Sequence, residues 1–157
     1  MNQYAAGALA GFLATIPMSI AMAGLHRRLP PELQYPLPFY GITSTFLAKT
    51  GIRPAFSTTQ ERYTTLALHF GFGAVAGALA PLVLRPSHLS LVKGACYGVG
   101  VWAASYQGWV PGLGLHRAAT QQPRERVGLM VAVHLVWGAS LAAMLRQQAN
   151  QESLPPA

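Results

Sequence analysis

The sequence predicts an all-α membrane protein, a bundle of four transmembrane helices made from two parallel helical-hairpin repeats. Three observations favour this fold: an apolar composition, four long apolar segments, and a set of motifs that occurs twice in one order. Of the 157 residues, 52% are hydrophobic and 10% are charged. Soluble domains carry about 25% charged residues, so we expect this chain to meet a lipid bilayer. Its net charge of +7 comes from basic residues that lie between apolar segments, which suits anionic lipid headgroups and excludes a nucleic-acid-binding face.

Each apolar segment has about the 20 residues that a helix needs to cross the hydrocarbon core. We expect one membrane domain spanning residues 1–157, in which a turn at Arg85–Ser90 joins the two repeats. The predicted crossings are residues 4–25, 64–84, 91–110 and 127–145; repeat one is 4–84, repeat two is 91–145, and 146–157 form a flexible C-terminal tail.

The first connection is long and contains a proline-rich stretch followed by a segment that can form a short interfacial helix. We expect Phe39, Ile42 and Phe46 on one side of that helix, and Gly51 at its end.

Basic residues are distributed unevenly between the two predicted sides of the membrane. The side with the two longer connections would hold eight Lys or Arg residues, against three on the side with the termini and the short turn. The positive-inside rule places the longer connections in the cytoplasm, so we expect both termini on the periplasmic side. The first segment has no Lys or Arg before it and two arginines after it, so it is expected to be a retained helix.

Four motifs recur in the same order, which indicates a tandem duplication of a two-helix unit. Because each unit contains two crossings, both units should point the same way across the bilayer. The matched pairs are Gly7–Gly11 with Gly94–Gly98, Gly24–Arg27 with Gly114–Arg117, Glu61-Arg62 with Glu125-Arg126, and His69-x-x-x-Gly73 with His134-x-x-x-Gly138.

The two histidines in the apolar segments, His69 and His134, each share a helical stripe with small residues. Small residues in membrane helices mark helix–helix contacts, so we expect both imidazoles inside the bundle, at matching depths. Such residues suggest function. One interpretation is a haem b whose iron is held by His69 and His134 and whose propionates meet Arg62 and Arg126. The other is that neutral imidazoles bond to their neighbours.

A polar cluster is predicted at the cytoplasmic ends of the helices, where the charges complement the helix dipoles. It would form either an ordinary hairpin end or a gate. Its members are His26, Arg27, Glu61, His116, Arg117 and Glu125. No metal site is predicted, since no carboxylate accompanies the histidines.

The last apolar segment, "HLVWGASLA" (His134–Ala142), resembles the closing helix of small multi-pass bacterial inner-membrane proteins of the YagU type. The resemblance implies a bacterial inner (cytoplasmic) membrane location and no defined activity.

The sequence favours a small, non-enzymatic membrane protein that packs with itself or with a larger complex through Gly/Ala faces. No paired carboxylates and no Ser-His-acid pattern are visible. Two alternatives stay open: a haem-binding electron-transfer subunit that uses the two histidines, and a small transporter or channel with its pathway along the pseudo-two-fold axis.

Overall fold

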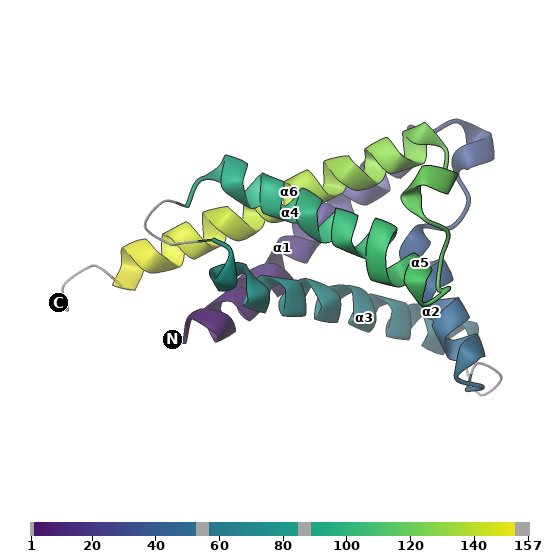
Figure 1. The fold of residues 1–157 in the computed structure, drawn as a ribbon, viewed down its shortest axis with the longest axis horizontal. Coiled ribbons are helices and arrows are strands. Elements are labelled where there is room, and N and C mark those ends of the chain that lie inside the picture. The colour runs from purple at the N-terminus through teal and green to yellow at the C-terminus, as the bar shows by residue number, and fades with distance from the viewer. Residues whose placement is uncertain (1, 53–56, 85–88, 153–157) are drawn as a thin grey trace.

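The computed structural model describes residues 2–52, 57–84 and 89–152, and every regular element in these ranges is a helix (Figure 1). This confirms the all-α class. The α-helices are α1 (Gln3–His26), α2 (Pro38–Lys49), α3 (Thr58–Leu79), α4 (Leu91–Ala103), α5 (Val110–Gly112) and α6 (Arg124–Glu152). The described residues also form three short 3₁₀ helices, η1 (Pro31–Leu33), η3 (Ala80–Leu82) and η6 (Ala119–Gln121), and one π-helix, η5 (Ala104–Trp109).

Local sequence explains where the long helices begin. The Asn2 side chain accepts a hydrogen bond from the Tyr4 N–H, and the Ser90 side chain accepts one from the Lys93 N–H. Ser57 forms a reciprocal capping box with Gln60 ahead of α3. Each cap satisfies backbone N–H groups that have no partner inside the helix.

Within the described ranges, three helices are long and apolar enough to cross a membrane: Gln3–His26, Thr58–Leu82 and Arg124–Gln151. Large apolar side chains on these helices and on α4 face outward. Ile20, Val75 and Val92 are 70%, 59% and 71% exposed, respectively. A bilayer would cover such surfaces, whereas a soluble domain seldom leaves them bare.

Glycines bring the helices of each pair together. In the first hairpin, α1 packs on α3 where Gly7 and Gly11 meet Gly73 and Gly77. A Cβ atom on any of these four glycines would collide with the facing helix.

The second hairpin uses the same device, with α4 packing on α6. Gly94 and Gly98 face Gly138, and a Cβ atom on Gly138 would collide with the Gly94 carbonyl. The Gly faces are therefore buried inside each hairpin, because the backbones of the two helices are in contact there.

The glycine contacts correct one part of the motif match between the two predicted repeats. The glycine that faces both glycines of the opposing helix is Gly77 in α3 and Gly138 in α6. His69 precedes Gly77 by eight residues, whereas His134 precedes Gly138 by four. The motif match, which paired Gly73 with Gly138, therefore aligned the wrong glycine of α3, and the matching depths of the two imidazoles stay a prediction.

The long helices of the two hairpins are linked by hydrogen bonds from Trp137 and Tyr97, and the hairpins also meet where α1 packs on α6. Trp137 of α6 donates its Nε1–H to the Gly11 carbonyl of α1 over 3.1 Å. Tyr97 of α4 donates its hydroxyl to the Ala76 carbonyl of α3 over 2.6 Å. The Tyr97 and Trp137 rings are stacked, with centroids 6.1 Å apart.

The predicted short helix in the first connection is present as α2, which packs against α3. Its buried residues include Thr43 and Leu47, while Phe46, expected on the same side as Phe39, is 45% exposed. Gly51 follows the helix with φ +74°, the left-handed conformation that glycine adopts without strain.

The helix at the C-terminus is longer than predicted. The predicted tail begins at residue 146, yet α6 continues to Glu152, so residues 146–152 are helical. The predicted turn at Arg85–Ser90 falls mostly outside the described residues.

Candidate functional site

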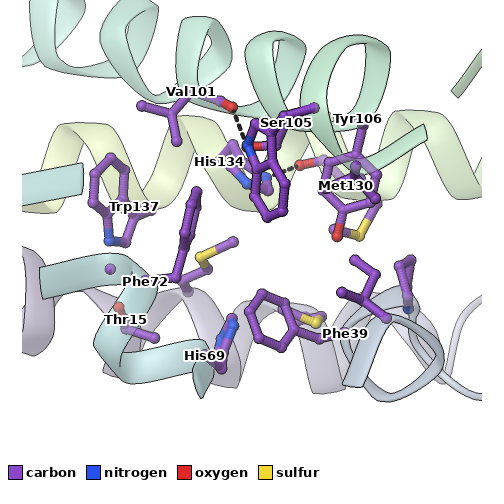
Figure 2. A pocket seen from close by; sticks show the side chains of 17 residues that line it. Thr15, Phe39, His69, Phe72, Val101, Ser105, Tyr106, Met130, His134 and Trp137 are labelled. Atoms are coloured by element: carbon purple, nitrogen blue, oxygen red, sulfur yellow. Dashed lines mark hydrogen bonds between the residues drawn. The ribbon is translucent and has the colours of Figure 1, made fainter. Parts of the chain in front are cut away.

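A small cavity of about 50 Å³ lies between the two hairpins, near the end that carries α2 and α5 (Figures 1 and 2). Residues from α1, α2, α3, α4, η5 and α6 line it, so it exists only when both hairpins are in place. Its wall is aromatic and apolar, with two imidazoles and three thioethers. Its lining residues include Met18, Met22, Phe39, His69, Ser105, Tyr106, Trp109, Met130, His134 and Trp137.

His134 enters the cavity from α6 and is 6% exposed. Its Nδ1 lies 2.7 Å from the Met130 carbonyl oxygen (Figure 2). A carbonyl can only accept, so Nδ1 carries the proton and Nε2 keeps a lone pair. The Tyr106 ring stands edge-on to this imidazole, at 6.3 Å between centroids.

His69 enters from α3 on the opposite side of the cavity (Figure 2). The Ser19 hydroxyl donates to the Thr15 carbonyl over 2.7 Å and lies 3.3 Å from His69 Nε2. Because the only hydroxyl proton of Ser19 is already used, the ring must donate from Nε2. Nδ1 of His69 therefore keeps a lone pair. Phe39 of α2 packs edge-on against the same ring, with centroids 4.6 Å apart.

The π-helix η5 supplies Ser105, Tyr106 and Trp109 to the cavity wall. It interrupts the helix that begins with α4, and Gly108 inside it has non-helical dihedral angles of φ −108° and ψ −107°. Such π-turns occur often at functional sites. Sequence reasoning missed this feature.

The spacing of the repeated motifs differs between the two halves at the place where η5 lies. Gly24 follows Gly11 by thirteen residues, whereas the matching Gly114 follows Gly98 by sixteen. The interval with three extra residues, Gly98 to Gly114, contains the π-helix η5.

Arg126 is 3% exposed and fastens the first connection to the start of α6. Its guanidinium donates to the backbone carbonyls of Leu33, Tyr35 and Pro36 at 2.8, 2.9 and 3.0 Å. It also lies over the Tyr35 ring, 3.7 Å from the centroid. The guanidinium is thus committed to the connection, which covers this end of the cavity.

Arg62, the predicted counterpart, is exposed and lines an open groove of about 550 Å³ outside the cavity. The groove shares Met22, Phe39 and His69 with the cavity. These three side chains therefore form the wall between the cavity and the groove.

Members of the predicted polar cluster differ in burial. Glu61 is buried, at 6% exposed, whereas Arg27, Arg117 and Glu125 are exposed. None of these four lines the cavity.

The two histidines of that cluster also lie outside the cavity lining. His26 Nε2 lies 3.1 Å from the Tyr35 carbonyl oxygen. His116 is half-buried beside Gly41 of α2. Burial lowers the pKa of His116, and the charges of Arg126 and Arg117 lower it further.

The predicted haem does not fit the geometry. Cofactor pockets are typically about 300–1,000 Å³, whereas this cavity holds about 50 Å³. Arg126 is bound to backbone carbonyls. Separating the two hairpins to admit a porphyrin would also break the hydrogen bonds of Trp137 to Gly11 and of Tyr97 to Ala76.

Comparison with known proteins adds no family. The chain matches no family model, no curated protein and no solved structure. The interpretation of the cavity therefore depends on its own residues. Among these, the three methionines, which sequence reasoning missed, are spaced to share helix faces: Met18 with Met22 on α1, and Met130 with His134 on α6.

Proposed function

We propose that this chain is a non-enzymatic integral membrane protein that binds a small molecule or ion in the cavity between its two helical hairpins. One observation carries the proposal: the cavity collects both intramembrane histidines, each with one ring nitrogen free to accept. A polar nitrogen in an apolar setting is costly unless a neighbour or a ligand pairs with it.

The proposed topology has four crossings, with the second hairpin contributing α4 to α5 and α6. The stretches of 13, 6 and 3 residues in α4, η5 and α5 follow one another without a break. Together they supply about the 20 residues that a crossing needs. In Figure 1, α1 begins and α6 ends at one end of the molecule, and the connections that carry α2 and η6 lie at the other.

That arrangement supports both termini on one side, which the positive-inside rule makes the periplasmic side of a bacterial inner membrane. The YagU-type resemblance favours the same location. The surroundings would be lipid on the outer helix faces, since Ile20, Val75 and Val92 are exposed there.

Binding is favoured over scaffolding by where the small residues lie. The Gly/Ala faces expected to recruit a partner are occupied within each hairpin, at contacts such as Gly11 with Gly77 and Gly98 with Gly138. A partner or a second copy would have to use the large apolar side chains outside instead.

Binding is also favoured over catalysis. Ser19 and His69 form the Ser–His contact nearest the cavity, but the hydroxyl proton of Ser19 is donated to the Thr15 carbonyl. The histidine is therefore a donor to Ser19 and not its base, which leaves no activated nucleophile there.

Passage through the membrane is the second candidate, favoured by the adjoining groove. His69, Phe39 and Met22 separate the cavity from that groove, so passage would require a change in the position of these side chains. Such a change allows entry from the α2 end without separating the glycine contacts.

The test is native mass spectrometry of the protein released from membranes in a mild detergent. We expect the wild-type chain to retain a non-lipid adduct, and the His69→Leu/His134→Leu double variant, which keeps side-chain bulk, to lose it. His116→Leu is the matched control, because that histidine lies outside the cavity lining. A wild-type chain without an adduct, or an adduct unchanged in the double variant, would contradict the proposal.

A further inference from the structure

We propose that the ligand of this cavity is a soft monovalent metal ion, Cu(I), held by the imidazoles of His69 and His134 and the thioethers of Met18, Met22 and Met130. The inference rests on the proposed ligand-binding role of the cavity and names the chemistry of the ligand. It extends the donor set beyond the histidines to residues that the sequence analysis did not use.

The methionines supply the first argument. Met18, Met22 and Met130 all line the cavity and are 5%, 7% and 5% exposed. Spacings of four residues place Met18 with Met22 and Met130 with His134 on single helix faces. Thioether sulfur is a soft ligand that selects Cu(I) over harder ions.

The hydrogen bonds of the histidines supply the second argument. A metal-binding histidine almost always donates its other ring N–H to an oxygen, which fixes the ring and raises its basicity. His134 does this toward the Met130 carbonyl at 2.7 Å, and His69 does it toward the Ser19 hydroxyl at 3.3 Å. Each ring is left with one lone pair for a metal.

Size and charge select the kind of ion. A cavity of about 50 Å³ has room for a single ion or a few water-sized particles, since one water needs at least about 10–15 Å³ of such a volume. Its lining residues include no carboxylate and no cysteine, and no group of three or more His, Cys, Asp or Glu occurs among the described residues. A divalent ion such as Zn²⁺ would lack anionic ligands in this apolar site. A single positive charge on polarisable neutral ligands is the better match.

The experiment is an anaerobic titration of the detergent-purified full chain with Cu(I), in competition with a chromophoric Cu(I) chelator. Ag(I), which does not change oxidation state, is the parallel probe. We expect one Cu(I) per chain. The triple variant Met18→Leu/Met22→Leu/Met130→Leu keeps side-chain volume, so it should fold. We expect it to weaken binding by at least about 100-fold, the upper end of what loss of outer-shell partners causes.

Met144→Leu is the matched control, because Met144 packs at the edge of the core without lining the cavity. A second readout does not depend on variants. Methyl-labelled methionine resonances of Met18, Met22 and Met130 should shift on addition of Ag(I), while that of Met144 should not.

The outcomes separate the two proposals. Absence of Cu(I) and Ag(I) binding by the folded wild-type chain, or binding unchanged in the triple variant, overturns the metal assignment. If the histidine-dependent adduct of the mass-spectrometry test persists in that case, the cavity binds another ligand and the proposed function stands. If the adduct is also missing, both fail.

Discussion

The two hairpins close in the same way and differ at the end where α2 and α5 lie. Both hold their helices together by glycine contacts, centred on Gly77 in one and Gly138 in the other. The first helix of the first hairpin, α1, is a single helix of 24 residues. The first helix of the second hairpin is interrupted by η5 at the end where α2 and α5 lie. The shared contact fixes the hairpins, and the differences at one end create the cavity between them.

The two Gly-Leu-His-Arg motifs show this divergence within four identical residues. In the first copy Gly24 belongs to α1. In the second copy Gly114 has φ +62° and follows α5 in a turn. Identical local sequence therefore takes two conformations, because the preceding π-helix redirects the second copy and the Lys49 ammonium donates to the adjacent Leu113 carbonyl at 2.7 Å.

Breaking the shared contact should give the largest effect. Gly11→Ala in the first hairpin and Gly138→Ala in the second each place a methyl group against the facing backbone. Backbone cannot rotate away as a side chain can, so we expect each change to destabilise the protein by about 3 kcal/mol or more. The measurement is the unfolding midpoint in detergent, followed by tryptophan fluorescence.

The chain offers matched controls for that comparison on the same two pairs of helices. Gly71 of α3 and Gly100 of α4 have nothing within 4 Å of an added Cβ atom. Ala at either site should leave stability unchanged or raise it slightly, by up to about 1 kcal/mol. Equal sensitivity of all four glycines would show that the hairpins do not close as described.

The second comparison is between Arg126 and Arg62, which the motif match treats as equivalent. Arg126→Met removes three hydrogen bonds to carbonyls of the first connection and leaves those oxygens unpaired. We expect a loss of about 2–3 kcal/mol. Arg62→Met, at an exposed site, should change stability by less than about 0.5 kcal/mol. Thermal unfolding of both variants checks this, and a similar loss in each would rule out the fastening role of Arg126.

A third comparison uses the two glycines of the repeated motif. Gly114→Ala should destabilise by about 1 kcal/mol, because φ +62° is unfavourable for a residue with a Cβ atom and that atom would also crowd the Lys49 Nζ. Gly24→Ala should stabilise by up to about 1 kcal/mol, since the site is helical and open. Opposite signs in chemical denaturation are the expected result; the same sign in both would refute the conformational difference.

The sequence predicted the helical class, the approximate positions of three long apolar helices and the helix within the first connection. These follow from local composition and from Gly-x-x-x-Gly spacing, which act over one or two helical turns. It paired Gly73 with Gly138, whereas Gly77 makes the matching contact, because the glycine that faces the opposing helix is decided by packing between helices. It also missed η5, whose only trace is a difference of three residues between matched intervals.

The cavity itself could be predicted only in part. The sequence predicts the two histidines as site residues because an ionisable residue is unusual in an apolar segment. The methionines look like ordinary core residues in sequence, and only the fold brings Met18 and Met22 of α1 together with Met130 of α6. Arg126 was assigned to propionates because its carbonyl partners lie about ninety residues away along the chain.

The smallest predicted effect is the pH dependence of stability that His116, in the second Gly-Leu-His-Arg motif, causes. Burial and the charges of Arg126 and Arg117 lower the pKa of His116 in the folded chain, whereas the unfolded value is about 6.5. The unfolded state therefore binds a proton more readily, so stability falls as pH drops below about 6.5. His116→Gln should reduce this loss between pH 7.5 and 5.5. Arg117→Gln, which keeps the imidazole and removes one repelling charge, should reduce it less. Unfolding midpoints measured at both pH values check the order; a wild-type slope retained in His116→Gln would assign the pH dependence to other groups.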